Sequence, residues 1–165
     1  MRFRIEQRFR GALPDVEAAL FDPAFLTRLA TLPKLGAPEL LDQESDDTSI
    51  RQRVRYQFTG DVSSAVRRVV DPRRLTWVEE STHDLTTHVT TWRIVPDHYG
   101  SMIRCGGTFT LVPEGEGTTT RRIAEGDIKV NVPLVGGKVE RAIVSGLEEH
   151  ADAEVDVLDR WLAES

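Results

Sequence analysis

With 165 residues, the chain is long enough for one domain with a buried core and shorter than the length at which cores usually divide. The hydrophobic fraction of 39% and the charged fraction of 29% are ordinary for a soluble globular protein, and no apolar run approaches the ~20 residues of a membrane-spanning helix. The net charge of -6 argues against a general nucleic-acid binder. We therefore expect a single domain over residues 1–165, with no nucleic-acid partner and no membrane-spanning segment.

The start of the chain alternates charged and apolar residues, and it lacks the continuous apolar run of a secretory signal. The only cysteine, Cys105, cannot form an internal disulfide, and there is no group of thiols to hold a metal. These features predict a cytoplasmic protein. The composition does not indicate an oligomeric state.

The first third of the chain predicts a strand, two short helices and two further strands. Period-two alternation over residues 2–10 predicts a half-buried strand with Gln7 on its inner face. Asp22 and Pro23 have the types typical of a helix start, so we expect short helices on both sides of this point. Strands are then expected over residues 39–45 and 49–58. The second of these strands directs arginines outward and the following residues inward: Ile50, Gln52, Val54, Tyr56 and Phe58.

The middle of the chain predicts an antiparallel meander. Residues 61–70 fit a short helix, and a strand is the alternative interpretation. Strands are expected over residues 75–82, 85–95, 101–112 and 118–132, because turn-forming residues separate these segments at short intervals. The inward side of the strand that carries Trp92 is not determined by its pattern.

A long amphipathic helix is predicted over residues 135–163, which contain no proline and carry an apolar stripe at helical spacing. His150 and Glu154 are four residues apart near the middle of this stripe, so both should face the sheet. Burial of such groups is costly without partners. The pair is therefore a satisfied structural network, a ligand-orienting site or an acid-base pair, and the sequence leaves these three interpretations open.

The order of these elements resembles the START/Bet v 1-like superfamily, also called SRPBCC or helix-grip. The segments FDPAF at residues 21–25 and DIKVNVPLVGGKVE at residues 127–140 are similar to those of an actinobacterial family of uncharacterised function within it. The resemblance implies an α+β helix-grip fold, in which a curved antiparallel sheet of about seven strands, two short helices and one long C-terminal helix enclose a cavity. In relatives such cavities hold lipids, sterols, polyketides or other apolar small molecules, and some relatives catalyse cyclisation, aromatisation or hydrolysis.

Three functions follow as hypotheses. The first is binding or carriage of an apolar small molecule, such as a lipid, polyketide or isoprenoid-like compound, without catalysis. The second is a cyclase, aromatase or dehydratase that uses His150 and Glu154, and the third is a protein-interaction module. The candidate ligand-binding residues are the two helix residues together with inward polar and aromatic residues of the strands: His150, Glu154, Gln7, Gln52, Tyr56, Phe58, Trp77 and Trp92.

Other motifs give no support for cofactor or metal chemistry. The segment from Gly136 to Lys138 lacks the first glycine of a phosphate loop, and Val139 stands where that motif needs Ser or Thr. The four histidines show none of the spacings typical of metal ligands, and no Gly-x-Ser-x-Gly motif occurs. We therefore expect no cofactor, no metal site and no assigned catalytic residue.

Overall fold

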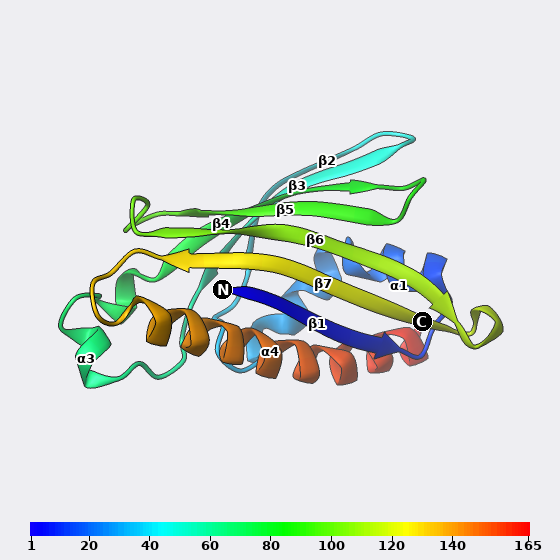
Figure 1. The fold of residues 1–165 in the computed structure, drawn as a ribbon. Helices are drawn as coiled ribbons and strands as arrows, with labels where there is room; N and C mark the ends of the chain where they lie inside the picture. The colour runs from blue at the N-terminus through cyan, green and yellow to red at the C-terminus, as the bar shows by residue number, and fades with distance from the viewer.

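A computed structural model describes all 165 residues and shows a seven-stranded antiparallel sheet with one long helix lying across its concave face (Figure 1). The spatial order of the strands is β1-β7-β6-β5-β4-β3-β2, so only the pairing of β1 with β7 joins strands that are distant in sequence. The strands are β1 (Arg2–Phe9), β2 (Glu39–Ser45), β3 (Ser49–Gln57), β4 (Thr76–Asp84), β5 (Val89–Pro96), β6 (Ile103–Glu114) and β7 (Thr119–Val130).

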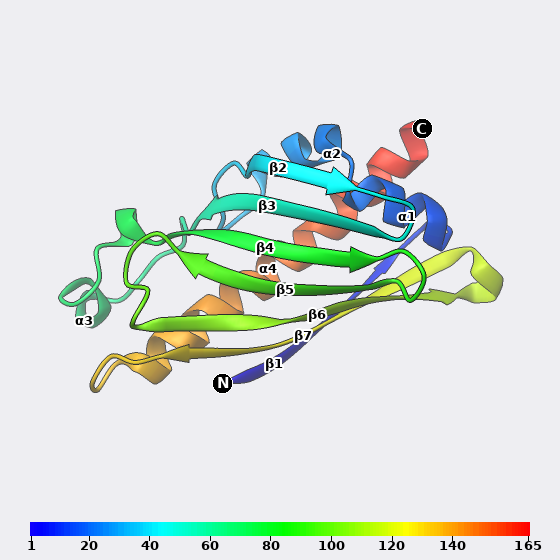
Figure 2. The same ribbon diagram turned by 90° about the horizontal axis from the view of Figure 1, so that it is seen from above.

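Four α-helices accompany the sheet: α1 (Leu13–Leu20), α2 (Pro23–Arg28), α3 (Ser64–Arg67) and α4 (Gly136–Glu164). The Asp22 side chain caps α2 by accepting from the Ala24 N–H, and Ser63 caps α3 in the same way through Val66. Figure 2 shows α4 crossing diagonally behind the strands, with α1 and α2 near its C-terminal end and α3 near its start. No helix combines the length and apolar character that crossing a membrane requires.

The predicted α+β helix-grip fold is confirmed, including the seven strands and the long terminal helix. Most element boundaries fall within a few residues of those expected. Within residues 61–70, which the sequence left open between helix and strand, Ser64–Arg67 form a single helical turn, α3, and its cap is Ser63. The register also determines the face of Trp92, because this residue pairs with Ser81 on one side and Gly107 on the other and is buried.

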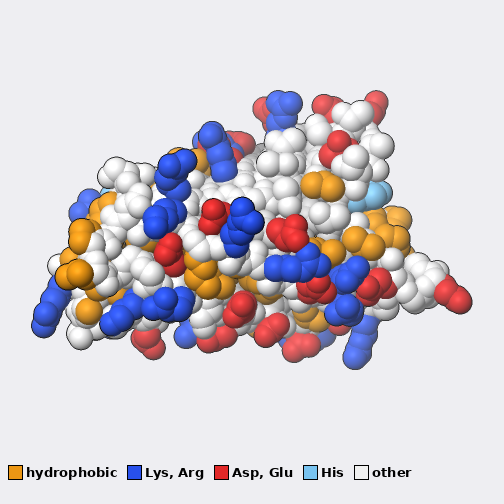
Figure 3. Space-filling view, viewed as in Figure 1, with side chains coloured by type: hydrophobic (Ala, Val, Ile, Leu, Met, Phe, Trp, Pro, Cys, Tyr) orange, Lys and Arg blue, Asp and Glu red, His pale blue; other side chains and the backbone are white.

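The buried core has two parts on the concave side of the sheet. One part surrounds the start of α4 and contains Phe58, Ile128 and Val139, and the other lies under α1 and α2 and contains Phe9, Phe25 and Leu158. The two parts leave a space between them where the middle of α4 passes over the strands. On the outer surface near β1, Figure 3 shows positive and negative side chains intermixed.

Candidate functional site

A cavity of about 200 Å³ lies between the sheet and α4, and 18 of the 26 residues that line it are hydrophobic. The cavity is therefore suited to an apolar molecule with few polar groups. Two aromatic pairs contribute to its wall: Tyr56 stacks on Trp77 with ring centroids 6.1 Å apart, and Trp92 stacks on Phe109 at 5.3 Å. Seven of the eight candidate residues line this cavity: His150, Glu154, Gln7, Tyr56, Phe58, Trp77 and Trp92.

Gln52 is the exception and does not line the cavity. Its side-chain oxygen accepts from Gln43 Nε2 at 3.0 Å, and the same nitrogen donates to the Phe21 carbonyl at 2.9 Å. Gln52 does face inward, as its parity predicted, but this part of β3 lies beside the turn between α1 and α2. The prediction for Gln52 therefore has to be corrected: it joins β2 and β3 to that turn.

A hydrogen-bonded polar cluster of Gln7, Arg122 and Glu154 occupies the inner face where β1, β7 and α4 meet. Arg122 Nε donates to Gln7 Oε1 at 2.7 Å, and the Arg122 guanidinium forms a close ion pair with Glu154 Oε2. Gln7 Nε2 donates to Glu154 Oε2 at 3.1 Å and to the Ala151 carbonyl at 2.7 Å. The guanidinium carbon also lies 5.5 Å from the ring centroid of Phe109. The cluster thus satisfies the buried carboxylate and joins α4 to β1 and β7, the first two strands at one edge of the sheet.

The charges in this cluster determine how its ionisable groups titrate. Burial by itself would raise the pKa of Glu154, but the Arg122 and His150 charges and the Gln7 hydrogen bond outweigh it, so the pKa lies below its usual value. The pKa of His150 is lowered, chiefly by burial, against the opposing charge of Glu154. Near neutral pH we therefore expect an ionised Glu154 beside a neutral His150. Glu154 is then a fixed charge, unsuited to proton transfer.

Glu79 is the titratable group whose properties suit acid-base chemistry in this cavity. It projects from β4, where it pairs in register with Val54 and Ile94, and its side chain lines the cavity. Burial raises the pKa of Glu79 to about 7, and the Glu154 charge adds to this effect while Arg122 opposes it. A carboxyl with this pKa can both donate and accept a proton near neutrality.

Two other lining residues hold buried polar atoms that have no hydrogen-bond partner in the protein. These atoms are the indole Nε1 of Trp92 and the Nδ1 of His150. Such orphaned groups are uncommon in folded proteins, because each costs about 1 to 3 kcal/mol. Together with Glu79 they give an otherwise apolar cavity a small set of polar groups available to a ligand.

Glu79 and Arg122 were not predicted from the sequence, although strand parity could have identified both. Trp77 was placed in the cavity, and a residue two positions along a strand lies on the same face, which is where Glu79 is found. Arg122 shares the inner face of β7 with Ala124. Each of these residues has a neighbour of the same type, Glu80 beside Glu79 and Arg121 beside Arg122. Residue type alone therefore does not show which of the two neighbours faces the cavity.

A family model described as "Protein of unknown function (DUF2505)" matches residues 4–162 of the chain. The chain belongs to this family. No curated protein matches the sequence.

Solved structures with the same architecture have low sequence identity to this chain. The crystal structure of TTHA0849 from Thermus thermophilus superposes with a TM-score of 0.71 at 18% identity, covering 99% of this chain and 98% of that one. The Zhui aromatase/cyclase from a Streptomyces species gives a TM-score of 0.65 at 14% identity, with 99% and 93% covered. A START superfamily protein from Mycobacterium smegmatis gives 0.59 at 15% identity, with 97% and 98% covered. At these identities the likeness establishes the START-like fold of this chain.

Proposed function

We propose that the protein binds an apolar small molecule, of the lipid, polyketide or isoprenoid class, in the cavity between the sheet and α4. The observation that carries this proposal is an apolar cavity whose lining includes the Glu79 carboxyl, with its raised pKa, and two buried polar atoms without a protein hydrogen bond, Trp92 Nε1 and His150 Nδ1. A ligand with an apolar body and one or two oxygen functions would satisfy both features. The Gln7–Arg122–Glu154 cluster then has a structural role at the boundary of the site.

Binding can be tested with two matched tryptophan substitutions on β5. Ile94→Trp adds volume inside the cavity, whereas Val95→Trp makes the same kind of change at a neighbouring residue that is 39% exposed. Native mass spectrometry of protein purified from its own host should show a retained small molecule in the wild type and in Val95→Trp. Ile94→Trp should lose it while keeping the wild-type circular dichroism spectrum. A ligand-free wild-type mass, or equal retention by both variants, would contradict the proposal.

A cyclase, aromatase or dehydratase activity is the second candidate, and the raised pKa of Glu79 favours it. In this version Glu79 replaces the His150–Glu154 pair as the proton-transfer group, because Arg122 holds Glu154 ionised. The fold likeness to an aromatase/cyclase gives the candidate a structural precedent.

The two candidates differ in what happens to a retained ligand. The extracted molecule should be incubated with wild-type protein and with Glu79→Gln, and its mass followed over time. An unchanged mass together with an unchanged chromatographic retention time with the wild type supports binding alone, because ring closure without loss of water alters retention but not mass. Loss of one water with the wild type but not with Glu79→Gln would instead establish catalysis.

A further inference from the structure

A second group of polar residues lies at the α1 end of the sheet and outside the cavity lining. Glu17 comes from α1, His83 from the end of β4, and His88 from the turn that leads into β5. The Asp84 side chain forms this turn by accepting from the Thr86 and Thr87 N–H groups at 2.7 and 3.0 Å. On the inner face, Ser81 separates His83 from Glu79, so the cluster is roughly 13 Å along the strand from the cavity carboxyl.

The three side chains converge on one carboxylate oxygen. His83 Nε2 lies 2.6 Å and His88 Nδ1 2.7 Å from Glu17 Oε1, and the candidate ligand atoms all lie within 4.8 Å of one another. The His83 side chain has no solvent exposure, whereas the His88 side chain is 34% exposed. The cluster is therefore anchored in the interior and reachable from solvent on the His88 side.

We infer that Glu17, His83 and His88 form a binding site for a divalent transition-metal cation of the zinc class. Two imidazole nitrogens and one carboxylate oxygen are a ligand set that Zn²⁺ uses when a fourth position is left for water or another small ligand. Mg²⁺ and Ca²⁺ are disfavoured, because they prefer sites built from oxygen atoms. The partial exposure of His88 gives a cation access to the site.

The surroundings of His83 support metal binding independently of the three ligands. The second ring nitrogen, Nδ1, lies 2.8 Å from Thr90 Oγ1, and the Phe21 ring packs against the imidazole with centroids 4.6 Å apart. A metal-bound histidine usually has its other nitrogen held by a hydrogen-bonding group, which fixes the ring orientation. Thr90 is buried and paired with His83 in the β4–β5 register, so it is positioned for this role.

Metal binding requires a change of tautomer that the site can accommodate. Without metal, the Glu17 carboxylate can only accept, so His83 donates to it from Nε2, and in the tautomer with its one proton there Nδ1 accepts from the Thr90 hydroxyl. With metal at Nε2, the proton resides on Nδ1 and donates to Thr90 Oγ1 instead. A hydroxyl serves both arrangements by rotating. The Glu17 oxygen must also move from 2.6 Å to about 3.3 Å from Nε2, the separation of two tetrahedral zinc ligands.

The direct test is zinc uptake by tag-free protein after treatment with a chelator. Equilibrium dialysis against Zn²⁺, followed by elemental analysis, should show one zinc per chain, and Mg²⁺ should not compete. Cobalt in place of zinc should give visible d–d absorption. Glu17→Gln and His88→Gln should each weaken zinc binding by about tenfold or more. Asp15→Asn, which removes a negative charge from an exposed position of the same helix, should leave it unchanged.

Two further measurements distinguish a metal site from a structural tether between α1 and the sheet. Zinc should raise the melting temperature of the wild type but not of His88→Gln. Nitrogen-15 NMR of the histidine rings should show the His83 proton moving from Nε2 to Nδ1 on zinc addition. A wild type that takes up no zinc at about 100 µM, or a His88→Gln variant that binds zinc as tightly as the wild type, would overturn the inference.

Discussion

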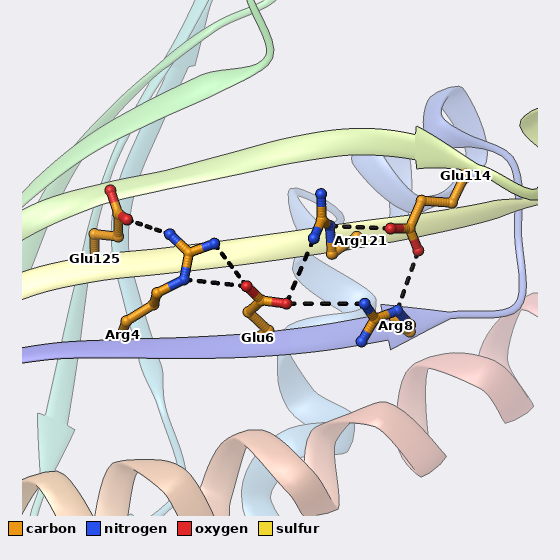
Figure 4. A network of polar contacts seen from close by, with 6 residues as sticks. All are labelled: Arg4, Glu6, Arg8, Glu114, Arg121 and Glu125. Atoms are coloured by element: carbon orange, nitrogen blue, oxygen red, sulfur yellow. Dashed lines mark hydrogen bonds and ion pairs between the residues drawn. The ribbon is translucent and has the colours of Figure 1, made fainter.

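Neighbouring arginines on β7, Arg121 and Arg122, take part in two carboxylate networks on opposite faces of the same sheet. Arg122 points to the concave side, where it pairs with Glu154 and its side chain is 14% exposed. Arg121 points to the convex side and joins a network across β1, β7 and β6 that Figure 4 shows as a chain of alternating charges. The members of this outer network are Arg4, Glu6, Arg8, Glu114, Arg121 and Glu125.

The surroundings of an ion pair, more than the pairing itself, decide its importance. In the outer network, side-chain exposure ranges from 28% for Arg121 to 61% for Arg8, so water can solvate each charge when its partner leaves. In the inner cluster Glu154 is 8% exposed, and its carboxylate depends on Arg122 and Gln7 for hydrogen bonds. The inner cluster should therefore be sensitive to mutation and the outer network tolerant.

Arg122→Met should have the largest effect, because it leaves the Glu154 carboxylate buried without its counter-ion and Gln7 Oε1 without its donor. We expect a loss of about 3 to 5 kcal/mol in the free energy of unfolding, measured by urea denaturation near pH 7. The loss should shrink at low pH, because protonation of Glu154 then removes the unpaired charge.

The double variant Arg122→Met/Glu154→Leu provides the control for this prediction. It removes both charges together, so it should recover most of the stability lost in the single variant. A double variant as unstable as Arg122→Met would show that packing, and not the unpaired carboxylate, causes the loss.

The distinction between the concave and convex faces of the sheet also explains which residues of the site could be predicted from the sequence. Alternation placed Gln7, Tyr56 and Trp77 on the inner face, and the helical stripe placed His150 and Glu154 opposite them, because hydrophobic periodicity determines which side of an element is buried. Periodicity does not determine what covers each part of a face. Gln52 is therefore inward but outside the cavity, since this part of the sheet lies beside the α1–α2 turn.

Long-range pairing accounts for the rest of what the sequence did not reveal. The partner that satisfies Glu154 is Arg122, which is 32 residues away, and the partner of Glu17 is His83, which is 66 residues away. Helical or strand spacing can identify neighbours within one element only. Metal-ligand spacing within one helix does not describe this cluster, whose residues come from a helix, a strand and a turn.

Glu79→Gln should have an intermediate effect that depends on pH. Burial raises the pKa of Glu79 in the folded protein from 4.5 to about 7, so wild-type stability falls as pH rises through this range. The stability of the glutamine variant does not fall in this way, because glutamine does not ionise. Its free energy of unfolding should equal that of the wild type below pH 4.5 and exceed it by at most about 3 kcal/mol at pH 8.

Glu80→Gln is the matched control, because Glu80 stands next in sequence, faces outward and accepts from Arg93 Nε at 2.7 Å. Urea denaturation of the two variants and the wild type at pH 5 and pH 8 measures the difference. Equal pH dependence for Glu79→Gln and the wild type would show that the cavity carboxyl has an ordinary pKa.

Arg121→Met, the counterpart of Arg122→Met on the outer face, should have the smallest effect. Its guanidinium lies 3.1 Å from Glu114 and 3.6 Å from Glu6, but both carboxylates keep Arg8 as a second partner. We expect the free energy of unfolding to fall by less than about 1 kcal/mol in low salt. The decrease should be smaller still in about 1 M NaCl, because salt screens exposed charges. The loss in Arg122→Met should change little with salt, since its uncompensated charge is buried. Equal losses for the two arginines, or equal salt dependence, would contradict the distinction between the faces.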